Sequence, residues 1–91
     1  MKINICQRFK STTDGILKMV VKIYNSNIIP RKGDFIEDEA WKKPKKVMEV
    51  TINYNIEECY VDLPFEETEY SVEEYTKMYK SHGWKELQEI S

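Results

Sequence analysis

The stretch Val47-Met-Glu-Val-Thr-Ile-Asn-Tyr-Asn-Ile-Glu-Glu-Cys-Tyr-Val-Asp-Leu-Pro-Phe65 decides the fold class. Its side chains alternate between apolar and polar, break at a short polar run, and then alternate again. Alternation with a period of two places one set of side chains on one face of a strand, and a short polar break joins two strands in a hairpin. We therefore predict strands over residues 47–54 and 59–63.

Three further strands are predicted upstream, over residues 2–9, 16–24 and 34–37. Asp14-Gly15 supplies the positive φ of a tight turn between the first two. In the second strand, Leu17 and the apolar residues that follow it at every second position are assigned to the inner face. Lys18 and Lys22 are expected to point outward, with Val20 between them.

One helix is predicted near the end of the chain, over residues 72–82. Ser71 and Glu74 have the spacing of a capping box, and Gly83 is a typical residue just beyond a helix. A helix of about three turns is too short to be stable alone. Its aromatic face must therefore pack against the sheet.

These elements predict an α+β domain: a small antiparallel five-stranded curled sheet, or partly open barrel, with one C-terminal helix. The residues assigned to its core are Ile3, Ile5, Leu17, Met19, Val21, Ile23, Phe35, Met48, Val50, Ile52, Val61, Leu63, Tyr75, Met78 and Tyr79.

The length of 91 residues fits a single domain, 1–91, with a modest core. The net charge is only −2, but residues 1–46 carry +6 and residues 47–91 carry −8. Such a division either creates a binding surface of one sign or lets the two halves pair internally. We favour internal pairing.

The chain has no apolar run of the roughly 18 residues that a membrane span needs, and residues 1–9 contain no apolar stretch of signal-peptide length. We therefore expect a cytoplasmic protein without membrane contact. Cys6 and Cys59 both fall in predicted strands. We expect two free thiols, which a cytosolic compartment keeps reduced, with Cys6 the more accessible.

The residue types that usually carry catalysis do not form a constellation in this sequence. His82 is the single histidine, and no Cys or His spacing matches a zinc site. Glu57 and Glu58 lie in a predicted turn, where carboxylates keep ordinary pKa values. We expect no catalytic residue, no metal and no cofactor, and hence no enzyme.

Protein contacts are the first functional hypothesis. Trp41 lies in an irregular loop, either tucked against the core or presented at the surface, and aromatic residues are enriched in interface cores. The second strand is apolar on both faces. A second copy of the chain covering the face of Val20 and Tyr24 would form a homodimer.

Nucleic-acid binding is the alternative hypothesis, through the Lys-rich loop 42–46 and the basic pair before it. Lysines neutralise phosphates and an exposed Trp stacks on a base. The overall pI of about 5.5 weighs against it. The candidate residues are Arg31, Lys32, Lys42, Lys43, Lys45 and Lys46.

The stretch Ile29-Pro-Arg-Lys-Gly-Asp-Phe-Ile36, followed by a Trp-bearing loop and by Gly83-Trp84 after the helix, resembles small uncharacterised phage and prophage proteins of Gram-positive bacteria. The resemblance covers residues 28–84 and consists of turn motifs. It implies a small β-barrel or curled sheet with a helix and no assigned activity. With the residues above, it suggests a non-catalytic protein-interaction module, a phage or prophage accessory protein with an unidentified protein partner.

Overall fold

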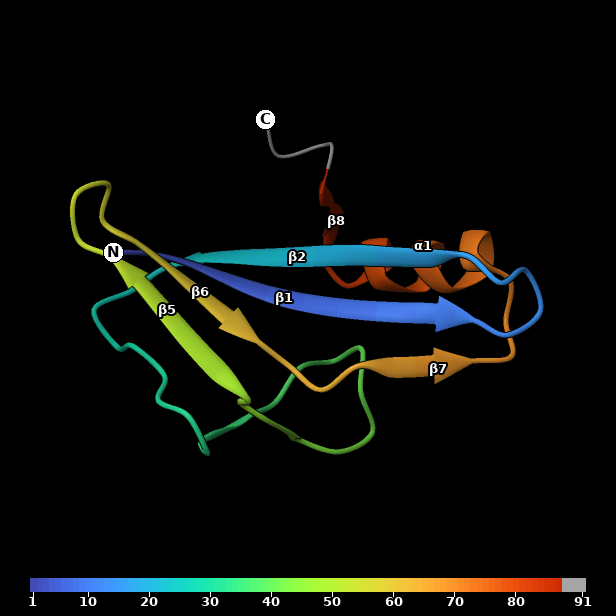
Figure 1. The fold of residues 1–91 in the computed structure, drawn as a ribbon, viewed down its shortest axis with the longest axis horizontal. Helices are drawn as coiled ribbons and strands as arrows, with labels where there is room; N and C mark the ends of the chain where they lie inside the picture. The colour runs from blue at the N-terminus through green and yellow to red at the C-terminus, as the bar shows by residue number, and fades with distance from the viewer. Residues whose placement is uncertain (88–91) are drawn as a thin grey trace.

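The computed structural model describes residues 1–87 as a curved sheet with one helix (Figure 1). In chain order the elements are β1 (Lys2–Ser11), β2 (Leu17–Asn25), β3 (Phe35–Ile36), β4 (Lys45–Lys46), β5 (Glu49–Asn53), β6 (Glu58–Asp62), β7 (Glu66–Thr68), α1 (Val72–Ser81) and β8 (Lys85–Glu86). The α+β class is therefore confirmed.

The main sheet is mixed and open, with strand order β5-β6-β1-β2-β8, whereas the sequence predicted a wholly antiparallel one. β1 pairs antiparallel with β2 but parallel with both β6 and β7. β1 is long enough for β6 to pair with its first half and β7 with its last three residues. Alternation identifies a strand but not its neighbours, so the parallel pairing could not be seen in the sequence.

The shorter strands account for the remaining differences. The strand predicted over residues 34–37 shrinks to β3, which pairs with β4 in a separate two-stranded sheet. β4, β7 and β8 are two or three residues long and were not predicted. Such short segments have too few residues for alternation to be detected.

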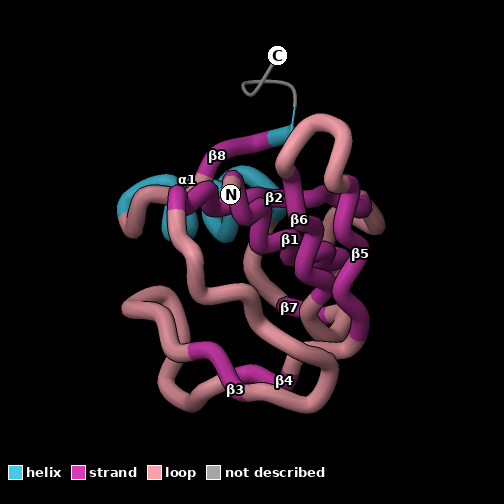
Figure 2. The backbone as a smooth tube through the Cα atoms, turned by 90° about the vertical axis from the view of Figure 1, so that its left-hand side faces the viewer, coloured by secondary structure: helices cyan, strands magenta, loops and turns pink. Residues whose placement is uncertain are grey.

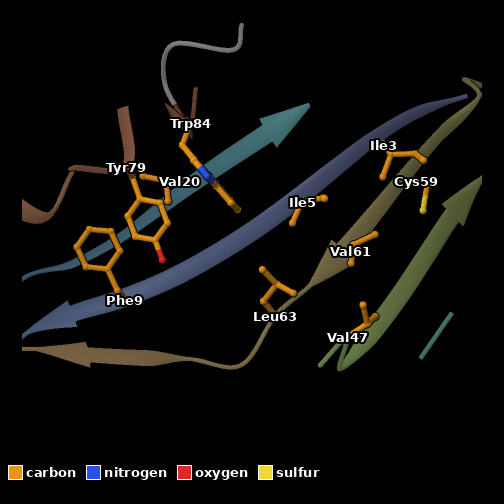
Figure 3. Close-up of a cluster of buried hydrophobic side chains, with 10 residues drawn as sticks. All are labelled: Ile3, Ile5, Phe9, Val20, Val47, Cys59, Val61, Leu63, Tyr79 and Trp84. Atoms are coloured by element: carbon orange, nitrogen blue, oxygen red, sulfur yellow. The ribbon is translucent and has the colours of Figure 1, made fainter. Parts of the chain in front are cut away.

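The main sheet has an inner face, covered by α1 and the segment 28–48, and an outer face that neither covers. Figure 2 shows α1 and the β3–β4 segment on the same side of the sheet. The buried core lies between the inner face of the sheet and these covering elements (Figure 3). Its members are Ile3, Ile5, Phe9, Val20, Val47, Cys59, Val61, Leu63, Tyr79 and Trp84.

The predicted face assignment of β2 is wrong. Val20 is fully buried in the core, and it pairs with Gln7, which also points inward from β1. Lys18 and Lys22 share the covered face with Val20, whereas Leu17 lies on the outer face and is 66% exposed. Both faces of β2 carry apolar residues, so the pattern alone could not tell which one the helix would cover.

The predicted core is otherwise mixed. Six of its members are buried, whereas Leu17, Phe35 and Met48 are exposed and the rest are half-buried. Phe35 is exposed because its strand pairs in the separate β3–β4 sheet and not in the main sheet. Core residues that the sequence did not identify are Cys6, Phe9, Val20, Val47, Cys59 and Trp84.

The helix matches its prediction to within one residue. The Ser71 side chain accepts a hydrogen bond from the Glu74 amide, and His82 caps the other end. Gly83 has a φ of 87°, a conformation that glycine adopts without strain and that turns the chain into Trp84. In residues 1–87 there is no helix with the length and apolar character of a membrane span.

Candidate interaction surfaces

A buried hydrogen-bonded cluster is centred on Glu66 of β7. Its carboxylate accepts hydrogen bonds from the hydroxyls of Tyr79 and Tyr75, the latter at 2.7 Å. Lys45 Nζ lies 2.7 Å from Glu66 Oε1 and also donates to Gln7 Oε1 at 2.8 Å. The cluster therefore ties together the helix, the sheet and the segment 28–48.

Trp41 belongs to this internal cluster, which settles the alternative left open by the sequence: it is tucked against the core. Its Nε1 donates to the Tyr79 hydroxyl oxygen at 2.9 Å, and its ring centroid lies 5.6 Å from that of Trp84. Lys45 Nζ lies 4.7 Å from the centroid of the Trp41 ring, a cation–π distance. The polar end of Trp41 is therefore occupied within the fold.

Burial shifts the pKa values of the tyrosines and the lysine around Glu66. Burial, and then the hydrogen bond to the Glu66 carboxylate, raise the pKa of Tyr79 far above its usual range, and the pKa of Tyr75 rises for the same reasons. Burial lowers the pKa of Lys45, although the contact with Glu66 opposes this. Because each of these polar groups has an internal partner, we interpret the cluster as structural.

Asp38 makes a second internal connection, between the segment 28–48 and the end of the helix. Its carboxylate accepts from Lys22 Nζ at 2.7 Å, from Trp84 Nε1 at 3.0 Å and from the Ala40 amide at 3.0 Å. Burial alone would raise the pKa of Asp38, but the hydrogen bonds from Lys22 and Trp84 hold it below its usual value. Lys22 therefore points inward because it has a buried partner there.

The charge division between the two halves of the chain is used internally. Ion pairs join the basic half to the acidic half across the structure, as the favoured interpretation of the sequence proposed. They are Lys2–Glu58, Arg8–Asp62, Lys18–Glu86, Lys32–Glu49 and Lys45–Glu66.

The six basic candidates for nucleic-acid binding do not act as one group. Lys45 is engaged with Glu66 and only 16% of its side chain is exposed. Lys32 pairs with Glu49 at 3.3 Å on the surface. The other four candidates, Arg31, Lys42, Lys43 and Lys46, are exposed.

The outer face carries an exposed apolar surface, which we call the outer patch and define as Leu17, Met19, Phe65 and Leu87. Leu17, Phe65 and Leu87 are each more than half exposed. Met19 lines two adjoining hollows of about 420 and about 190 Å³, one shared with Leu17 and Phe65 and the other with Leu87. Contiguous exposed apolar surface of this kind marks sites of protein contact.

The other two predicted contact residues, Val20 and Tyr24, differ in their exposure. Val20 is covered by the helix and is not available to a partner. Tyr24 is 44% exposed and lines a groove of about 440 Å³ on the inner face, beside Ile28 and Ile36. The sequence identified Tyr24 but gave no sign of the outer patch, because Leu17 and Met19 were assigned to the core.

The thiols and the histidine remain apart. Cys6 and Cys59 are free and buried, and they point to opposite faces of adjacent strands, since Cys6 pairs with Asp62 while Cys59 pairs with Ile3. Burial, reinforced by Asp62, raises the pKa of the Cys6 thiol to about 11, which disfavours the reactive thiolate at neutral pH. Within residues 1–87, no group of three His, Cys, Asp or Glu residues could hold a metal ion.

A search of protein-family models finds no match to this chain, and searches of curated proteins and of solved structures find none either. The phage-type resemblance of the turn motifs therefore stays a prediction. Functional inference rests on the surfaces described above.

Proposed function

We propose that the protein is a non-catalytic interaction module that binds a protein partner through the outer patch. The observation that carries this proposal is the exposure of Leu17, Phe65 and Leu87 together on the sheet face opposite α1. Burying one such side chain in a partner contributes about 1.5–3 kcal/mol of transfer free energy. A face left this apolar is therefore stabilised by a partner.

Further support comes from the charges on the same face. Lys2 and Glu58 lie 3.1 Å apart, and Arg8 and Asp62 lie 3.6 Å apart, so each charge is balanced within the chain. Paired charges around an apolar centre resemble the polar rim and apolar core of protein interfaces. A strongly charged ligand would gain little on this face, whereas an apolar protein surface would gain most.

Affinity capture with matched variants tests the proposal. The native protein, a Leu17→Glu/Phe65→Glu variant and an Ile28→Glu control serve as baits in an extract of the cells in which the chain is made. Ile28 is 83% exposed and lies away from the outer patch. We expect a protein that the native bait and the control retain, that the double variant loses, and that binds purified native bait directly.

Two results would contradict it. Recovery of the same proteins by the native bait and the double variant would remove the outer patch as the contact. Loss by the Ile28→Glu control alone would move the contact to the groove beside Tyr24. Thermal melts of all three baits show that the differences do not arise from unfolding.

Single-stranded nucleic acid is the second candidate ligand, favoured by one observation. Phe35 is 68% exposed and is the register partner of Lys46 in the β3–β4 sheet, so an exposed aromatic ring lies beside an exposed lysine. Stacking on such a ring contributes about 1–3 kcal/mol per base. A mobility-shift series at low salt should show binding that Phe35→Ala weakens; no shift at tens of micromolar protein would exclude this candidate.

A further inference from the structure

β5 forms one end of the main sheet, and its outer edge has no strand partner within residues 1–87. Figure 2 shows β5 at the margin of the molecule, with β6 on its inner side. Unpaired strand edges readily pair with other chains unless lysine, proline or a bulge protects them. β5 reads Glu-Val-Thr-Ile-Asn and contains neither lysine nor proline.

The hydrogen-bond pattern shows which groups of β5 are available. The Lys2 amide donates to the Glu57 carbonyl, so odd-numbered residues of β6 face β1 and even-numbered ones face β5. Thr51 is the register partner of Tyr60 and therefore directs its amide and carbonyl at β6. By the same alternation, Val50 and Ile52 direct theirs away from the sheet.

We propose that a second copy of this chain pairs with the open edge of β5, antiparallel and two-fold symmetric, with Thr51 facing Thr51 of the other copy. In this register Val50 lies opposite Ile52 of the other copy. The outward amides and carbonyls of both residues in both chains then bond across the junction. The two main sheets become one continuous sheet, and the outer patches lie on the same side of it.

Side-chain pairing supports a second copy as the occupant. On the inner face Val50 of each copy meets Ile52 of the other copy, so this contact is between apolar side chains. Val50 and Ile52 are only half-buried in the single chain, so both still have exposed apolar surface. Pairing with a copy gives each of them an apolar neighbour.

The side chains on the other face of β5 are also compatible with pairing between two copies. Thr51 meets Thr51, a favourable cross-strand pair, and Glu49 meets Asn53, so no like charges oppose one another. A self-complementary row on both faces is what an isologous two-fold contact requires.

A charge-swap experiment tests the register directly. Light scattering coupled to gel filtration, across about 10 to 200 µM protein, should give the native chain a mass approaching twice the 10.9 kDa of one chain. Thr51 is exposed, so Thr51→Lys and Thr51→Glu should both fold. Each alone places like charges at the two-fold axis and should weaken dimerisation at least about tenfold. An equimolar mixture of the two variants should restore the dimer.

Control variants separate this contact from the outer patch. Asn27→Lys adds the same charge at another exposed position and should leave the dimer unchanged. Ile52→Pro removes one outward amide without removing a bond to β6, and should also give single chains. A native mass of one chain throughout, a dimer that survives Thr51→Lys, or a dimer that Leu17→Glu splits instead would each overturn the proposal.

Discussion

The two faces of the main sheet use the same kinds of residue in opposite ways. On the inner face, ion pairs are formed inside the fold: Lys22 of β2 binds Asp38, and Glu66 of β7 binds Lys45 of the segment 28–48. On the outer face, charged pairs stay at the surface while leucine and phenylalanine are exposed. Composition therefore does not identify the covered face of this sheet. The covered face is instead determined by the packing and ion-pair partners that the segment 28–48 and α1 supply.

The largest contrast between the faces is expected within β2. Val20→Glu places a carboxylate in the fully buried core and should destabilise the protein by about 4 kcal/mol, enough to unfold it under many conditions. Leu17→Glu, three residues away on the outer face, should change the free energy of unfolding by less than about 0.5 kcal/mol. Urea unfolding followed by circular dichroism measures both. Equal effects would show that the two faces are covered alike.

The next largest effect on the free energy of unfolding is expected where a buried ion pair is broken, in comparison with an exposed one. Glu66→Gln leaves Lys45 buried without its carboxylate and should cost about 3 kcal/mol. Glu49→Gln breaks the exposed pair with Lys32 and should cost at most about 0.5 kcal/mol. Adding Lys45→Met to Glu66→Gln removes the unpaired charge and should recover part of the loss in urea unfolding. A Glu66→Gln variant as stable as the Glu49→Gln variant would contradict the structural role of the cluster.

Asp38→Asn should lower the free energy of unfolding by about 2 kcal/mol, a smaller effect that should depend on pH. Although burial opposes it, the hydrogen bonds from Lys22 and Trp84 hold the pKa of Asp38 in the folded chain below its usual value. The ionised carboxylate therefore stabilises the fold above about pH 4, and this stabilisation is lost as the pH falls through the folded-state pKa. Asp38→Asn should be less stable than the native chain at pH 7, with a difference that shrinks in acid. A difference that stays constant from pH 7 to about pH 2 would contradict this assignment.

The sequence was most informative where a local rule is sufficient. The capping residues Ser71 and Glu74, with Gly83, placed the helix to within one residue, because caps satisfy backbone groups of the helix itself. Alternation located β1, β2, β5 and β6 for the same reason, since it reports on neighbouring residues of one strand. The surroundings of the candidate contact residues came only from the tertiary structure: Tyr24 is exposed in a groove, Trp41 is half-buried against the core, and Val20 is buried. The outer patch has no signal in the sequence pattern.

By itself, the sequence determined the α+β class, the helix and the sets of side chains that share a strand face. Only the tertiary structure decided which set is covered, because that depends on elements that return from elsewhere in the chain. β6 and β7 pair parallel to β1, and α1 then lies over Phe9 and Val20. The alternating stretch of residues 47–54 became the edge of the sheet for the same reason. Its own pattern specifies a strand, whereas its position at the edge depends on strands more distant in the sequence.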